Sequence, residues 1–119
     1  MIELFIPMKP VPKGRPRFGK GRVYTPQKTL QAEEIIAWTV TAYMLANRIE
    51  ITKNPVYLTA IFQFKKACRV DIDNLGKLVF DALNGIAYLD DNQIVSCSFA
   101  KTVTDAEGIY LMIKEVGHV

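Results

Sequence analysis

Segments in which apolar and polar residues alternate, as in a strand, are followed along this chain by segments in which apolar residues recur at helical spacing. Residues 2–11 alternate weakly and are rich in β-formers, which predicts a first strand. Residues 26–47 predict a helix, because Pro26 suits a first helical turn and apolar side chains then recur near helical spacing. These side chains are Leu30, Ile35, Trp38, Ala42 and Leu45. Residues 56–64 alternate again after the break at Asn54-Pro55, and they predict a strand.

A second helix is predicted within residues 69–85, where Asn84-Gly85 suits a C-terminal cap. Its core-facing stripe follows helical spacing and consists of Leu75, Leu78, Val79, Ala82 and Leu83. Asp73, Lys77 and Asn84 fall near the opposite side, with Asp81 on the flank. Residues 94–104 and 108–116 predict two strands joined as a hairpin by the turn residues between them. The order β-α-β-α-β-β predicts one α+β domain over residues 1–119, with a mixed sheet and two main helices.

Length and composition exclude several classes of protein. A chain of 119 residues, 50% of them hydrophobic, can bury a core without disulfide or metal staples. There is no CxxC, and the one histidine is His118, so zinc sites and histidine-activated nucleophiles are not expected. No apolar run approaches the roughly 20 residues of a membrane span, and no signal-peptide pattern follows Met1. We therefore expect a cytoplasmic protein with free thiols and no membrane partner.

Charge is segregated along the chain. Residues 1–70 carry a balance of +8 and residues 71–119 a balance of −5, within a net charge of +3. No acid occurs from Leu4 to Ala32, a stretch that contains the basic segment, defined here as residues 9–28. Its cations are Lys9, Lys13, Arg15, Arg17, Lys20, Arg22 and Lys28.

Nucleic-acid backbone binding is the favoured interpretation of the basic segment, because each cation that meets a phosphate releases counterions. Its prolines and glycines are expected to prevent regular structure and leave the charges unpaired within the protein. Phe18 lies among these charges, where stacking on a base would account for an exposed ring. No base-reading helix is predicted, so recognition of DNA shape is expected. The alternative is a flexible loop that only aids solubility.

Five aspartates and no glutamate lie between Asp71 and Asp91. Taken singly, Asp73 is explained as a helix N-cap and Asp90-Asp91 as a solvated turn. Together, short carboxylates indicate a site where oxygen positions matter, such as a Mg²⁺ site. Lys77 would either pair with Asp73 or neutralise charge on a scissile phosphate. An EF-hand is excluded by the apolar residues at its ligand positions, a nucleotide P-loop is absent, and a phosphatase starting at Asp71 lacks the buried apolar strand before it.

The pattern "DIDNLGKLVFDALNG…LDDNQ" resembles the RusA family of Holliday junction resolvases, which is common in prophages. The matching positions are Asp71, Asp73, Asn74, Lys77, Asp81, Leu83, Asn84, Gly85, Asp90, Asp91 and Gln93. The opening "IPMKPVPKGRPRFGKGRVYTP" also resembles many members. The resemblance implies a RusA-like fold, a Mg²⁺ site with Mn²⁺ as an alternative ion, and a lysine required for cleavage. Carried onto this sequence, the metal ligands are Asp71, Asp73 and Asp91, with Asp90 as a further candidate, and the lysine is Lys77.

The resemblance further implies a homodimeric endodeoxyribonuclease that makes paired nicks in four-way junctions during recombination and repair. The candidate DNA-binding residues are Lys13, Arg15, Arg17, Phe18, Lys20, Arg22, Arg69 and Asn74. Some members carry an arginine directly before the first aspartate, whereas here Val70 stands there and Arg69 precedes it. The alternative function is a non-catalytic nucleic-acid-binding module whose aspartates only cap and solvate a helix.

Overall fold

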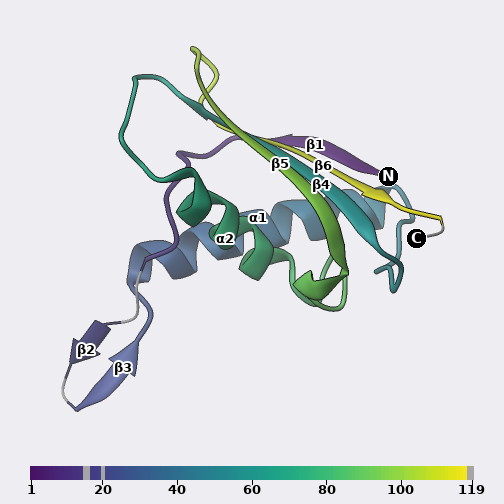
Figure 1. The fold of residues 1–119 in the computed structure, drawn as a ribbon, viewed down its shortest axis with the longest axis horizontal. Helices are drawn as coiled ribbons and strands as arrows, with labels where there is room; N and C mark the ends of the chain where they lie inside the picture. The colour runs from purple at the N-terminus through teal and green to yellow at the C-terminus, as the bar shows by residue number, and fades with distance from the viewer. Residues whose placement is uncertain (15–16, 20, 118–119) are drawn as a thin grey trace.

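The computed structural model describes residues 1–14, 17–19 and 21–117, with only the backbone described for Arg17 and Tyr24. A mixed four-stranded sheet lies against two helices, and a small two-stranded hairpin projects from this body (Figure 1). The predicted α+β class and the order of the main elements are confirmed. No helix within the described ranges is long and apolar enough to cross a membrane.

The sheet contains β1 (Ile2–Ile6), β4 (Val56–Phe64), β5 (Ile94–Val103) and β6 (Gly108–Glu115) in the order β1-β6-β4-β5. β6 is antiparallel to both β1 and β4, whereas β5 is parallel to β4. The predicted hairpin between the last two strands is wrong, because β4 lies between them. Turn residues in 105–108 signal a reversal of the chain, but they do not determine which strand becomes the neighbour.

One face of the sheet forms the core. Along β1, β4 and β6, buried side chains that face the helices alternate with exposed or half-buried side chains on the other face. A strand has this period because successive side chains point to opposite faces of the sheet. The buried members include Ile2, Ile6, Leu58, Ala60, Phe62, Ile109, Leu111 and Ile113. Helix α1 (Gln27–Ala46) and helix α2 (Ile72–Leu83) cover this face and pack against each other (Figure 1).

Helix α1 is confirmed, but its apolar residues lie on both its buried side and its exposed side. The buried side consists of Thr29, Ala32, Ile36, Val40 and Met44. The side chains that predicted the helix, among them Trp38 and Leu45, lie on the exposed side. Apolar residues occupy so much of the circumference that helical spacing identifies the helix without identifying its core face.

Helix α2 follows its predicted pattern closely. All five residues of the predicted stripe are buried, whereas Asp73, Lys77, Asp81 and Asn84 are exposed. Gly85 follows the C-cap Asn84 with φ 77°, so the predicted C-terminal cap is confirmed. Gly76 lets the helix approach β5, because a Cβ atom there would lie 2.3 Å from the Phe99 ring. Tight packing on β5 thus fixes where the polar face of α2 points.

The projecting hairpin consists of β2 (Arg17–Gly19) and β3 (Arg22–Tyr24). Our expectation of no regular structure in the basic segment was therefore wrong. Glycines placed at the turn favour a hairpin rather than prevent one, since Gly21 has φ 76°, a conformation that side chains disfavour. The basic segment thus includes a two-stranded arm.

Candidate active site

The N-terminal end of α2 presents two carboxylates that the fold does not use as caps. Asp71 is the N-cap residue, but its side chain makes no capping hydrogen bond. Asp73 lies in the first turn and is exposed. Neither forms an ion pair within the part of the chain that the structure describes. Capping therefore explains neither side chain, although the helix dipole stabilises both negative charges.

Positive charge surrounds this end of the helix. Lys77 is exposed one turn beyond Asp73 and forms no ion pair with it. From β5, the Lys101 ammonium donates a hydrogen bond of 2.8 Å to the carbonyl oxygen of Val70, directly before Asp71. One ammonium group is thus fixed at the residue before Asp71, and a cation near these carboxylates suits a phosphodiester held near a hard cation.

A hollow of about 460 Å³ adjoins the same end of α2. Its wall is formed by residues 9–12, 64–68, 70 and 107. Lys9, Lys65 and Lys66 supply exposed cations to it, and Arg69 is exposed next to it in sequence. Sequence reasoning did not single out Lys65 and Lys66, although their pairing just before the aspartates was the available signal.

Asp91 lies at the other end of α2. It begins the short 3₁₀ helix η1 (Asp91–Gln93) after the loop that leaves α2. Burial, the charge and hydrogen bond of Asp90, and the charge of Asp81 raise the pKa of Asp91, while a hydrogen bond from Asn84 acts in the opposite direction. Asp81, Asn84, Asp90 and Asp91 thus form a second acidic cluster, here called the distal cluster.

Gln93 holds the distal cluster in place. Its Oε1 accepts hydrogen bonds from the backbone N–H groups of Leu89 at 2.8 Å and Asp90 at 3.0 Å. Its Nε2 donates to the carbonyl oxygens of Thr52 at 3.0 Å and Asn54 at 2.9 Å. The family pattern contained Gln93, and the structure gives it a positioning role that spacing alone did not reveal.

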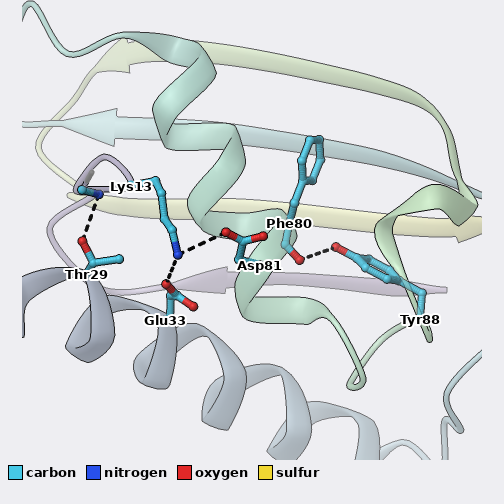
Figure 2. Close-up of polar contacts among 7 residues, drawn as sticks. Lys13, Thr29, Glu33, Phe80, Asp81 and Tyr88 are labelled. Atoms are coloured by element: carbon cyan, nitrogen blue, oxygen red, sulfur yellow. Dashed lines mark hydrogen bonds and ion pairs between the residues drawn. The ribbon is translucent and has the colours of Figure 1, made fainter. Parts of the chain in front are cut away.

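Tyr88 fixes the loop between α2 and η1 to the helix. Its ring is fully buried, and its hydroxyl donates a 3.0 Å hydrogen bond to the Phe80 carbonyl oxygen in α2 (Figure 2). Burial raises the pKa of Tyr88, and the charges of Asp91, Asp81 and Asp90 raise it further. The hydroxyl therefore stays neutral and structural.

Lys13 ties the basic segment to both helices. Its ammonium lies 2.8 Å from Glu33 of α1 and 3.1 Å from Asp81 of α2 (Figure 2). Its backbone N–H donates to the Asn74 carbonyl oxygen at 2.8 Å. Burial acts to lower the pKa of Lys13, but the two carboxylates outweigh it and raise the pKa. The expectation that no cation of this segment pairs internally was wrong here, because Glu33 and Asp81 reach Lys13 from other elements.

The three proposed metal ligands do not gather within one chain. Asp71 caps the start of α2 and Asp91 lies beside its C-cap, so a helix rise of 1.5 Å per residue separates them by about 20 Å. Among the described residues, no three Asp, Glu, His or Cys side chains are grouped to hold a metal ion. A single Mg²⁺ shell of Asp71, Asp73 and Asp91 therefore does not fit one protomer.

The remaining candidate DNA-binding residues lie partly on the projecting arm. Phe18 is 84% exposed on β2, opposite Val23 of β3, and Arg22 is exposed at the turn. Arg15 and Lys20 lie outside the described residues, as does the side chain of Arg17. Asn74 is half-buried and engages Lys13 through its backbone.

Comparison with known proteins gives one strong match. No curated protein matches the chain. The family model described as "Endodeoxyribonuclease RusA" matches residues 7–114, which include both helices, the β2–β3 hairpin, β4, β5 and all but the last residue of β6, whereas β1 precedes the match. The chain therefore belongs to the RusA endodeoxyribonuclease family.

Proposed function

We propose that this protein resolves Holliday junctions by hydrolysing one phosphodiester in each of two opposed strands. The observation that carries the proposal is the family match over residues 7–114, which includes the unpaired carboxylates at the start of α2. Paired, symmetric nicks require two equivalent sites, and a two-fold homodimer supplies them. The biological setting of this proposal is DNA recombination and repair in the cytoplasm, with a prophage as the genetic source.

The proposed cofactor is Mg²⁺, with Mn²⁺ as the alternative. Mg²⁺ commonly takes one or two carboxylates and completes its shell with waters and phosphate oxygens, which suits the Asp71 and Asp73 pair. When bound, it would orient a water and stabilise the leaving oxygen. Since one chain holds Asp91 about 20 Å from Asp71, we expect Asp91 to act at the site of a second protomer.

Other groups of the chain have roles that need no metal. The Lys77 ammonium would neutralise charge on the scissile phosphate, and Lys9, Lys65 and Lys66 would hold the flanking backbone beside the hollow. The β2–β3 arm, with exposed Phe18 and Arg22, would engage the branch point or an adjacent duplex. Hydrolysis adds water across the P–O bond, leaving a phosphate monoester on one side of the nick and a hydroxyl on the other.

Cleavage of labelled four-way, three-way and linear DNA, with Mg²⁺, with Mn²⁺ and with chelator, tests the proposal. We expect paired nicks in the four-way junction only when a divalent ion is present. Metal-dependent cutting of linear duplex at the same rate would contradict junction selectivity. Junction binding without any cutting would favour the non-catalytic binding module instead.

A further inference from the structure

The outer side of α1 carries a strongly exposed apolar stripe. Trp38 is 75% exposed and Leu45 is 76% exposed, with Leu30 at 46% and Ile35 at 44%. The core side of the same helix lies opposite, formed by Thr29, Ala32, Ile36, Val40 and Met44. At about 100° per residue, the exposed residues fall within roughly 80° of Trp38 on either side. The stripe is therefore one continuous face and not scattered single residues.

Such a face is unusual for a monomer. The four large side chains together expose on the order of 500 Å², near the upper end for a single surface patch. A standard interface covers roughly 800 Å² per partner, so a contact centred on the stripe with its polar neighbours reaches that size. A tryptophan at the centre is typical of the residues that dominate binding energy.

The stripe can pack against a second copy of itself when the two helices run antiparallel. Thr41 and Ala42 stand at its centre and are small. Trp38 and Leu45 flank them. Glu34 stands beyond Trp38 in α1, and Arg48 lies just past the other end of the helix, after the C-cap Asn47 and with φ 54°. In an antiparallel pair, Trp38 therefore meets the region of Leu45 on the other helix, and Glu34 lies near the end of that helix, where Arg48 follows it.

The charges at the two ends are available for such a pair. Within the described part of the chain, neither Glu34 nor Arg48 belongs to an ion pair, and both are exposed. Glutamate within the stripe opposes binding of a DNA backbone. An anionic lipid surface is disfavoured too, since the exposed face between Glu34 and Leu45 bears no cation. A second copy of this chain fits the pattern best.

We infer that the outer face of α1 from Glu34 to Leu45, with Arg48 just past the end of the helix, is a homodimer contact in which two copies of the helix pack antiparallel about Thr41 and Ala42. This inference rests on the proposed function, because that function requires a two-fold dimer. It adds the surface, the orientation and the residues that determine them.

Trp38 reports on this contact without any substitution, since it is the only tryptophan in the chain. On dilution of the full-length protein, we expect its fluorescence emission to shift to the red and acrylamide quenching to increase. Sedimentation velocity on the same series should show dimer converting to monomer over the same concentrations. If Trp38 is exposed to solvent at concentrations where the protein is a dimer, the inference is overturned.

Substitutions then test the proposed geometry. Trp38→Ser should weaken dimerisation about thirtyfold or more. Tyr57→Ser is the control, because it removes a half-exposed aromatic ring from the other face of the sheet, and it should leave dimerisation unchanged. Glu34→Arg and Arg48→Glu should each weaken the dimer severalfold, and the double reversal should restore it. Circular dichroism checks folding. A Trp38→Ser protein that dimerises normally, or a double reversal no better than either single one, would overturn the antiparallel contact.

Junction cleavage measured in parallel separates the two proposals. Wild-type protein that cleaves junctions while sedimenting as a monomer would reject the α1 contact and leave nuclease activity standing. Wild-type protein that dimerises through Trp38 without cutting any junction would reject the proposed function and leave the contact standing.

Discussion

Asp71 and Asp91 stand at opposite ends of the same helix. Asp71 is the N-cap of α2, and Asp91 lies beside Asn84, the C-cap. A 12-residue helix is rigid on the scale of a metal site, so these carboxylates cannot share an ion within one chain. A two-fold dimer in which the start of α2 of one protomer lies near the distal cluster of its partner would form two composite sites.

Mixing inactive variants tests this arrangement. We expect Asp73→Asn and Asp91→Asn each to abolish cleavage while keeping junction binding, because Asn removes charge with little change in size. An equal mixture, refolded or exchanged together, should recover about a quarter of wild-type nicking, since half the dimers are mixed and each mixed dimer has one intact site. Denaturing gels of an end-labelled junction measure the recovery.

A matched mixture serves as its control. Asp71→Asn with Asp73→Asn removes two residues from the same end of α2, so no mixed dimer regains an intact site. We expect no recovery there. If the first mixture also stays inactive, Asp91 does not complete the site of another protomer.

Lys77→Ala should slow cleavage far more than it weakens binding. Loss of one positive charge near a transition state costs on the order of 3 kcal/mol, or roughly a hundredfold in rate. One phosphate contact among many contributes much less to affinity. Single-turnover rates at saturating enzyme, beside a titration of junction binding, separate the two effects. Lys114→Ala, an exposed lysine near the end of β6, is the control and should leave both unchanged.

Asp91→Asn should stabilise the metal-free protein at neutral pH while removing activity. The folded state raises the pKa of Asp91, so it binds a proton more tightly than the unfolded chain does. That contribution is present below the ordinary Asp pKa of about 3.9 and is lost as pH rises through the raised value. We therefore expect a gain of about 0.5 kcal/mol at pH 7 that disappears near pH 3.

Thermal unfolding in chelator measures this gain, as a rise in Tm of about 2 °C. Asp105→Asn, at an exposed carboxylate in the β5–β6 connection, should not produce it. A gain that persists at pH 3 would show that the burial and charge repulsion acting on ionised Asp91 are not its source.

Gly76→Ala should destabilise the protein although alanine is the better helix former. The added Cβ would lie 2.3 Å from one Phe99 ring atom and 2.7 Å from another. Phe99 is itself held between Phe80 at 5.4 Å and Phe62 at 6.1 Å, so it cannot easily retreat. Overpacking costs roughly 1–3 kcal/mol against a helix-propensity gain of about 1 kcal/mol. Urea unfolding measures the balance, and a more stable variant would show that Phe99 moves freely.

The sequence predicted what local spacing controls. The buried stripe of α2, its exposed acidic face and the glycine cap all follow from helical periodicity and backbone sterics. Pairings across the sheet did not follow, because turn residues at 105–108 cannot tell whether β6 joins β5 or the far side of β4. The partners of Lys13 were missed for the same reason, since Glu33 and Asp81 are distant from it in sequence.

The candidate site was predicted by residue type and not by distance. The family pattern assigned Asp71, Asp73 and Asp91 the same role, that of metal ligands. In the structure, the whole of α2 lies between Asp71 and Asp91. The core face of α1 was also ambiguous, because large apolar residues stand on both sides of it, and tertiary packing buries Ile36 while leaving Trp38 exposed.

The β2–β3 arm should contribute to DNA affinity through two separable effects. Phe18 is 84% exposed, so Phe18→Ala removes a stacking surface without disturbing the core, and it should weaken junction binding by roughly 1–3 kcal/mol. Because stacking releases no counterions, the dependence of affinity on salt should stay unchanged. Neutralising Arg15 and Arg17 together should instead flatten the log–log salt slope by about 1.8. Binding titrations from low to high salt on one junction distinguish the two. An unchanged slope for the arginine variant would mean that these charges do not meet phosphate, whereas a changed slope for Phe18→Ala would mean that the ring positions the cations and does not stack.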